Sequence, residues 1–212
     1  MIYTNELKFK YPKENTLSFK DISLLAGQQT LIKGVSGSGK TTLLHLLSGV
    51  LTPESGSIII NDIHLEQLSN QQKDRFRAKN IGIIFQRNLF IKSLSMLENM
   101  LLAQRIAGNN TDKEILEEIL RELDISNLSG KIPHHLSQGE QQRFSIARAL
   151  VNRPKVILAD EPTSSLDDVN CVKFTELLKE VCEKFRVTLV IATHDSRLEQ
   201  AFNHIVELNH KK

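Results

Sequence analysis

The sequence predicts an α/β fold built on a parallel sheet, and three observations support this prediction. Short apolar runs of strand length alternate along the chain with longer segments of helical periodicity, which is the pattern of parallel strands covered by helices on both faces. A glycine-rich loop over residues 34–41 joins one such strand to a helix. From Ser93 to about Val151 the pattern is helical throughout, so we expect a helical insertion in the α/β core.

The composition limits the class of protein. The chain has 212 residues, 40% of them hydrophobic, which is enough for one domain with a buried core. Its 27 basic and 25 acidic residues give a net charge of +2 and are mixed along the chain, so we expect no nucleic-acid partner. No apolar run approaches the roughly 20 residues of a membrane span, and residues 1–12 contain no apolar core of a signal peptide. We therefore expect any membrane span to belong to another chain.

Short runs of β-type composition, bounded by turn residues, predict the strands. In chain order these runs are residues 7–11, 17–26, 29–34, 57–61, 81–86, 155–160, 187–193 and 204–208. Because apolar strands of this kind alternate with helices, most of them should pair in parallel. We expect the strand over 187–193 to lie beside the strand over 155–160.

Helix boundaries follow from capping residues, glycine and proline. The segments of helical periodicity are residues 41–51, 69–80, 94–109, 111–125, 137–153 and 167–185, and a short helix precedes the last strand. Capping boxes are predicted where a hydroxyl residue is followed three positions later by Gln or Glu, at Ser69 with Gln72, Thr111 with Glu114, and Ser137 with Glu140. Cys171 and Cys182 lie too far apart along one helix to form a disulfide, which is typical of a reducing compartment.

The loop GVSGSGKTT predicts a site for nucleotide phosphates. Its spacing meets the pattern G-x-x-x-x-G-K-[ST] between a strand and a helix, as that pattern requires. Glycines let successive backbone N–H groups turn toward an anion, and the N-terminus of the helix adds its positive end. Lys40 can reach the β- and γ-phosphates, and the hydroxyl of Thr41 can bind Mg²⁺. The alternative is a glycine-rich turn that binds no ligand. We favour an ATP-phosphate site, formed by Gly34, Ser36, Gly37, Ser38, Gly39, Lys40, Thr41 and Thr42.

Two acidic residues follow the apolar run at 156–159. Asp160 and Glu161 stand at the carboxyl end of a strand, where α/β sheets bind their ligands. Asp160 is placed to hold Mg²⁺ through water, and Glu161 to orient or deprotonate an attacking water. A solvated acidic turn is the alternative when the pair is taken alone. Together with the phosphate loop, the pair predicts nucleotide hydrolysis.

His194 ends the strand expected beside Asp160. From that position its ring could hydrogen-bond the γ-phosphate or the attacking water. A histidine at a strand end is more often structural, and none of the other histidines has a spacing that indicates a metal site. We interpret His194 as a functional residue.

Several motifs in order resemble one family. Beyond the phosphate loop they are LSQGE at residues 136–140, Gln86 after GIIF, SSLD at residues 164–167, and His194 in ATHD. Over nearly its full length the chain resembles the nucleotide-binding domain of an ABC ATPase. The resemblance implies that residues 1–212 form a single ABC ATPase domain with a P-loop NTPase core. It also implies an N-terminal antiparallel β subdomain to which residues 1–29 contribute, and an inserted helical subdomain of about residues 87–151.

The resemblance also assigns roles to single residues. Ser137 and Gly139 would meet the γ-phosphate held by the P-loop of a second subunit, so that ATP is sandwiched in a head-to-tail homodimer. Gln86 would couple Mg²⁺ and water to the helical subdomain, and Tyr11 would stack on adenine. The implied catalytic residues are Lys40, Gln86, Glu161 and His194, and the implied metal-site residues are Thr41, Gln86 and Asp160.

Some residues of the pattern keep a second interpretation. Gln86 could be a polar turn residue, and Phe9 or Phe19 could share the adenine contact with Tyr11. Asp167 could cap the following helix as well as reach the partner's P-loop, and Ser137 could cap its own helix as well as bind a phosphate. Gln138 stands where the family more usually has glycine, so we expect an altered affinity at the signature.

Within the family, the chain is most similar to ATPases of lipoprotein-releasing, macrolide-exporting and cell-division complexes. This implies a peripheral ATPase at the cytoplasmic face of the inner membrane, with separate transmembrane permease subunits docked on apolar residues between Leu89 and Leu94. Export of a lipoprotein, lipid or drug is one interpretation, and mechanical signalling in a cell-division complex is the alternative. Soluble ABC ATPases and P-loop kinases are disfavoured, because the chain has no coiled coil or second cassette and carries both the signature and His194.

Overall fold

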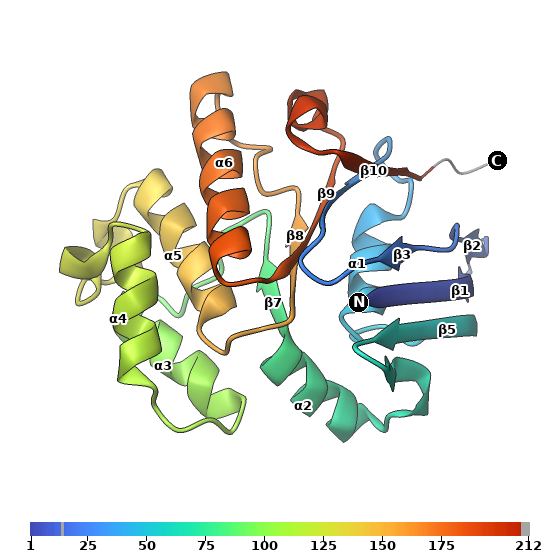
Figure 1. The fold of residues 1–212 in the computed structure, drawn as a ribbon, viewed down its shortest axis with the longest axis horizontal. Coiled ribbons are helices and arrows are strands. Elements are labelled where there is room, and N and C mark those ends of the chain that lie inside the picture. The colour runs from blue at the N-terminus through green and yellow to red at the C-terminus, as the bar shows by residue number, and fades with distance from the viewer. Residues whose placement is uncertain (14, 209–212) are drawn as a thin grey trace.

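The computed structural model describes residues 1–13 and 15–208, and a parallel sheet lies near its centre (Figure 1). The strands of this sheet stand in the order β10-β4-β9-β8-β7. Their bounds are β4 Gln29–Lys33, β7 Ile81–Ile84, β8 Val156–Asp160, β9 Thr188–Thr193 and β10 His204–Glu207. The neighbours β8 and β9 pair in parallel as expected, with Asp160 opposite Ala192.

A second, antiparallel sheet lies on the right in Figure 1. Its strands are β1 Ile2–Phe9, β2 Leu17–Ser18, β3 Ser23–Leu24, β5 Ser55–Ile60 and β6 Ile63–His64. β1 pairs with β2, β3 and β5, and β5 pairs with β6. The β-type run at 17–26 is therefore two short strands rather than one, and β5 and β6 complete the sheet begun by the N-terminal residues.

Helix α1 (Lys40–Leu47) packs between the two sheets. Its buried leucines Leu43, Leu46 and Leu47 join one apolar cluster with side chains of β1, β5, β8 and β9. The helix ends at Leu47 rather than Leu51, because Gly49 takes a φ of 69°, a left-handed conformation that glycine adopts without strain.

Further helices cover the opposite face of the parallel sheet, on the left in Figure 1. They are α3 Met96–Ile106, α4 Lys113–Glu122, α5 Gln138–Leu150 and α6 Asp168–Lys184, whereas α2 Asn70–Asn80 precedes β7. The side chains of β8 alternate between the two faces, because Val156 and Leu158 pack on the α1 side and Ile157 and Ala159 on the other. The free thiols of Cys171 and Cys182 are both buried in α6.

Short 3-10 helices connect the larger elements: η1 Leu65–Gln67, η2 Ser126–Leu128, η3 Pro133–His135 and η4 Ser196–Ala201. The helix expected before the last strand is η4. In the described parts of the chain, no helix has both the length and the apolar character needed to cross a bilayer.

Capping explains where most helices begin. Complete capping boxes start three of them, at Ser69, Ser95 and Ser137. The box predicted at Thr111 is wrong, because α4 begins at Lys113 and Asp112 is its N-cap, accepting a hydrogen bond from the backbone of Ile115 at 3.1 Å. Asp112 also bonds the guanidinium of Arg153 at 3.2 Å, and this contact with a distant part of the chain favours Asp112 as the cap.

Candidate nucleotide site

The glycine-rich loop follows β4 and leads into α1. Gly37 and Gly39 have φ angles of 78° and 85°, which only glycine adopts readily. Gly34 is packed closely, because a Cβ there would lie 2.3 Å from Oγ of Ser38 and 3.0 Å from the carbonyl oxygen of Leu208. The glycines of the sequence pattern are therefore required by backbone conformation and by packing.

The N-terminus of α1 differs from those of the other α-helices. It has no side-chain cap and no acidic residue in its first turn. Each of α2 to α6 begins with a serine or an aspartate whose side chain accepts a backbone hydrogen bond. Because the first N–H groups of a helix need acceptors and its positive end attracts anions, the start of α1 is suited to a phosphate group.

Lys40 is nearly buried at the start of α1, with 6% of its surface exposed. Its Nζ donates to the carbonyl oxygens of Gly34 at 2.9 Å and Val35 at 3.1 Å. The same Nζ lies 3.5 Å from Oε1 of Glu161. The ammonium is thus held beside the start of α1, where it can bind a phosphate oxygen in place of a carbonyl.

An open cleft of about 420 Å³ brings most of the predicted site residues together. It is lined by Tyr11, Leu17, Ser36, Gly37, Gly39, Lys40, Thr41, Thr42, Gln86, Glu161 and His194. Gly34 and Asp160 contact this set through Lys40 and Thr41. The cleft lies at the carboxyl ends of parallel strands, the usual ligand position in an α/β sheet.

The carboxylate of Glu161 is held by the residues that end β9. Its Oε2 accepts a hydrogen bond from Oγ1 of Thr193 at 2.7 Å, and its Oε1 lies 2.8 Å from Nδ1 of His194. Burial raises the pKa of Glu161, but the hydrogen bonds from His194 and Thr193 and the charge of Lys40 outweigh burial and lower the pKa below its usual 4.5. The carboxylate is therefore ionised at neutral pH and can accept a proton from water.

The backbone of Glu161 is strained. Its φ of 46° lies in the left-handed region, which costs a non-glycine residue on the order of 1 kcal/mol. The backbone N–H of Glu161 donates to the carbonyl of Ala192 at 2.8 Å, which anchors the strained residue to β9.

Asp160 and Thr41 provide oxygen ligands suited to Mg²⁺. Oγ1 of Thr41 donates to Oδ2 of Asp160 at 2.9 Å, and Oδ1 of Asp160 is buried with no hydrogen-bond partner within the described residues. Mg²⁺ prefers such oxygens and takes few protein ligands, the rest being phosphate oxygens and water. No group of three His, Cys, Asp or Glu side chains in the described ranges could hold a metal by itself. The residues therefore fit Mg²⁺ shared with nucleotide phosphates.

Tyr11 and Gln86 also line the cleft. The hydroxyl of Tyr11 lies 3.2 Å from Oγ1 of Thr42, and its ring packs edge-on against Phe9 with the ring centroids 4.7 Å apart. Nε2 of Gln86 donates to Oγ of Ser164 at 3.2 Å. The expected contacts of Tyr11 with adenine and of Gln86 with Mg²⁺ stay predictions.

Comparison with known families agrees with this geometry. The family model described as ABC transporter matches residues 18–164, more than half of the chain. This chain belongs to the ABC transporter family. It carries the nucleotide-binding P-loop ATPase part of that family.

Individual ABC proteins are similar over most of the chain. The lipoprotein-releasing system ATP-binding protein LolD of Legionella pneumophila (strain Lens) is 35% identical over 192 residues, which are 89% of this chain and 84% of LolD. The macrolide export ATP-binding/permease protein MacB of Campylobacter jejuni is 34% identical over 210 residues, 98% of this chain but only 33% of MacB. The dimeric structure of the ATP-binding cassette MJ0796 bound to ADP and Pi superposes with a TM-score of 0.84 at 31% identity, covering 99% of this chain and 94% of that one.

The ABC signature LSQGE stands apart from the P-loop cleft of the same chain. Oγ of Ser137 accepts from the backbone of Glu140 at 3.3 Å, and the carboxylate of Glu140 accepts from the backbone of Ser137 at 2.7 Å. Gly139 lines a different cavity, of about 220 Å³, between α5 and α6. Neither Ser137 nor Gly139 lines the P-loop cleft. The amide of Gln138 donates to Oγ of Ser165 at 3.0 Å.

Some side chains around Glu161 and His194 were not predicted from the sequence. Thr193 and Asp195 flank His194, and their position at a strand end beside Glu161 was a usable signal. No local pattern points to Arg197, which bonds Asp195. Asp167 caps α6, accepting from the backbone of Asn170 at 2.9 Å, so the capping half of its interpretation is confirmed.

Proposed function

We propose that this chain is the ATP-hydrolysing motor subunit of a membrane ABC transporter complex. One observation carries the proposal. The carboxylate of Glu161, held by Thr193 and His194, lies in one cleft with Lys40 and the uncapped N-terminus of α1. A base and an anion site thus face the same space, as hydrolysis of a nucleotide requires.

In the proposed reaction, the β- and γ-phosphates of ATP accept hydrogen bonds from the loop at 34–41, and Lys40 exchanges backbone carbonyls for phosphate oxygens. Glu161 takes a proton from water as the water oxygen bonds the γ-phosphorus and the bond to the β-phosphate oxygen breaks. ADP and phosphate result. His194 orients Glu161 and can donate to the γ-phosphate. When bound by Thr41 and, through water, by Asp160, Mg²⁺ would neutralise charge on the phosphates.

The proposed active unit is a head-to-tail homodimer. Ser137 and Gly139 lie outside their own chain's cleft, so a second copy is needed to bring them to a γ-phosphate. Within its own chain the Ser137 hydroxyl also hydrogen-bonds the carboxylate of Glu140, so it would exchange this acceptor for an oxygen of the partner's γ-phosphate. ATP would hold the dimer closed and hydrolysis would release it. The dimeric structure of the similar cassette MJ0796 supports a dimer as the active unit.

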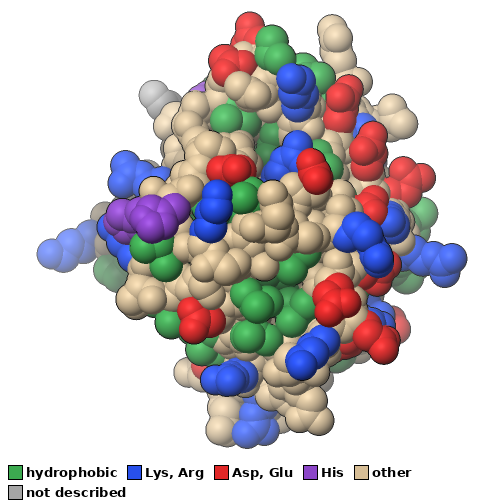
Figure 2. Space-filling model, turned by 90° about the vertical axis from the view of Figure 1, so that its left-hand side faces the viewer, with side chains coloured by type: hydrophobic (Ala, Val, Ile, Leu, Met, Phe, Trp, Pro, Cys, Tyr) green, Lys and Arg blue, Asp and Glu red, His purple; other side chains and the backbone are tan. Residues whose placement is uncertain are grey.

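We also propose a separate permease that docks beside the helical region, about residues 87–151. Leu89 and Ile91 are 55% and 46% exposed, and the ring of Phe90 lies under the guanidinium of Arg148, 4.8 Å from the ring centroid. Next to them is a cavity of about 250 Å³ lined by Asn88, Phe90, Lys92, Pro133, His134 and Gln141. On the side of α3 and α4, hydrophobic side chains are exposed among charges of both signs (Figure 2). An amphipathic helix of a permease suits such a groove.

This docking would make the chain a peripheral protein at the cytoplasmic face of the inner membrane. We propose export of a lipoprotein, lipid or drug as the work performed, since LolD is named for lipoprotein release and MacB for macrolide export. The alternative function is mechanical signalling without transport of a cargo, as in a cell-division complex.

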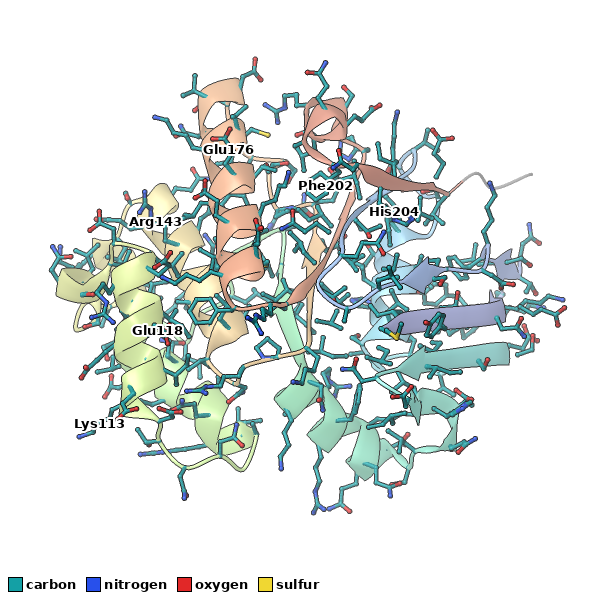
Figure 3. All side chains as sticks on the ribbon, in the orientation of Figure 1. Lys113, Glu118, Arg143, Glu176, Phe202 and His204 are labelled. Atoms are coloured by element: carbon teal, nitrogen blue, oxygen red, sulfur yellow. The ribbon has the colours of Figure 1, made fainter. Side chains whose placement is uncertain are left out.

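The variant Glu161→Gln tests the proposal. It removes the base but keeps Lys40 and Asp160, so ATP binding should persist, hydrolysis should fall by about 10²-fold or more, and an ATP-dependent dimer should appear in sedimentation. Glu118→Gln, on α4 away from the cleft (Figure 3), is the control and should behave as wild type. Wild-type hydrolysis by Glu161→Gln would show that Glu161 is not the base.

The membrane partner is tested with the same variant. Glu161→Gln is used with ATP to capture proteins from detergent-solubilised membranes. A polytopic membrane protein among them supports the permease, and transport by the reconstituted complex supports export. Capture of soluble proteins alone would contradict membrane coupling.

A further inference from the structure

A cluster of charged and hydroxyl side chains holds the loop between β8 and α6. This loop, residues 161–167, begins at Glu161 and ends at Asp167. The short helix η4 packs beside α6, at the end of the molecule where Figure 3 shows Glu176 on α6 and Phe202 just after η4. The second residue of η4, Arg197, contacts the loop from there.

Arg197 makes several contacts with one guanidinium. It donates to the carbonyl oxygen of Leu166 at 3.1 Å, to the carboxylate of Asp168 at 2.7 Å, and to the carbonyl oxygen of Thr163 at 3.5 Å. Its Nε and Nη2 also bond the two carboxylate oxygens of Asp195, at 2.8 and 2.7 Å. A single side chain therefore joins the loop, the first residue of α6, and the segment that follows His194.

Asp195 extends the contact to the base of the proposed reaction. Its Oδ2 accepts from Oγ1 of Thr163 at 3.1 Å, and its backbone N–H donates to Oγ1 of Thr193 at 3.0 Å. Thr193 in turn donates to Glu161 at 2.7 Å. The hydrogen bonds to Arg197 lower the pKa of Asp195 to about 2, so this carboxylate stays charged at neutral pH. A continuous series of hydrogen bonds thus runs from Arg197 to Glu161.

The same loop is bonded to the helical region. Ser164 accepts from the amide of Gln86 at 3.2 Å, just before that region begins. Ser165 accepts from the amide of Gln138 at 3.0 Å, at the first residue of α5. A change in the loop's position would therefore affect the carboxylate of Glu161, the P-loop cleft through Gln86, and the signature through Gln138.

We propose that Arg197 is a positioning residue that couples Glu161 to the rest of the loop, residues 162–167, so that the two ATP sites of the dimer act cooperatively. This inference rests on the proposed function, in which Glu161 is the base and the signature, bonded to the loop through Gln138 and Ser165, meets a second copy. The planar guanidinium has five donors in a fixed fork, which serve two carbonyls and two carboxylates at once. The single ammonium of lysine cannot span these acceptors.

The test measures the rate of ATP hydrolysis by the purified full chain as a function of ATP concentration. Arg197→Ala should lower kcat by roughly tenfold to a hundredfold, as a displaced catalytic group does, and should reduce a Hill coefficient above 1 to about 1. Binding of a fluorescent ATP analogue to the monomer should not change, because Arg197 does not line the cleft. Arg197→Lys keeps the charge without the fork, so its kcat and Hill coefficient should stay low while its melting temperature approaches that of wild type.

Glu199→Gln is the matched control. Glu199 lies on the same short helix and forms a comparable surface ion pair, with Lys33 at 2.7 Å, but does not contact the loop. It should retain the wild-type kcat and Hill coefficient.

Two results would overturn the inference. One is a folded Arg197→Ala with wild-type kcat and cooperativity, which would make the cluster purely structural. The other is full recovery of both quantities by Arg197→Lys, which would reduce the role of Arg197 to its charge. The proposed dimer is wrong if the wild type is not cooperative and Glu161→Gln does not dimerise. In that case the kcat of Arg197→Ala still decides whether Arg197 positions Glu161.

Discussion

Two helix N-termini have a role at a phosphate in the proposed function, and they are built differently. α1 begins without a side-chain cap or an acidic residue, and Lys40 lies at its start. α5 begins with a capping box in which Ser137 and Glu140 satisfy each other's backbone N–H groups. The first terminus can therefore bind an anion alone. The second is already satisfied within its own chain, and the carboxylate of Glu140 opposes an anion, so in the proposed dimer it contributes only when a partner brings a phosphate to it.

The largest effect is expected from a substitution at the α1 terminus. Lys40→Ala removes the cation beside α1, so the affinity for ATP should fall by about 100-fold or more and hydrolysis should be lost. Titration with a fluorescent ATP analogue measures the affinity. Lys20→Ala removes an exposed lysine and is the control. Near-normal affinity in Lys40→Ala would mean that the α1 terminus binds nucleotide without its lysine.

A smaller effect separates capping from phosphate binding. Ser137→Ala and Ser69→Ala each remove the serine of a capping box, and each should lower the free energy of unfolding by about 1 kcal/mol in urea titrations. Only Ser137→Ala also removes a proposed phosphate donor, so only this variant should hydrolyse ATP more slowly. Equal hydrolysis by the two variants would leave Ser137 with its structural role alone.

The smallest effect concerns pH. The hydrogen bonds from the backbone N–H and the hydroxyl of Ser137 lower the pKa of Glu140 below its usual 4.5. A lowered pKa stabilises the folded state above the unfolded pKa, and this contribution is lost as pH falls through the folded value. Of these two termini, only that of α5 makes this contribution, because α1 has no acidic residue in its first turn. The urea midpoint of Glu140→Gln should thus fall less between pH 7 and pH 4 than that of wild type, and an identical fall would contradict the assignment.

The α1 site was predictable because its chemistry is local. The loop at 34–41 contains its glycines, cation and hydroxyls within one stretch, and Asp160 and Glu161 follow a strand whose neighbour was also expected. The position of Thr193 at the neighbouring strand end was a usable signal for its bond to Glu161, whereas nothing in the sequence indicated the left-handed backbone of Glu161.

Contacts between distant parts of the chain account for the other differences. Thr111 and Asp112 are both good capping residues, and the contact with Arg153 that favours Asp112 is invisible to a local pattern. The pairing of β5 with β1 and the bonds of Arg197 to the loop before α6 likewise depend on how separate segments are brought together.

Mixing two inactive variants tests the central claim, that the α1 site of one chain works with the α5 terminus of another. Lys40→Ala lacks a working P-loop, and Ser137→Arg should keep ATP binding but block the signature. Each alone should be inactive. In a head-to-tail mixed dimer, the P-loop of Ser137→Arg meets the signature of Lys40→Ala, so one complete site forms and the mixture should regain ATP hydrolysis. A mixture as inactive as its separate components would contradict the account.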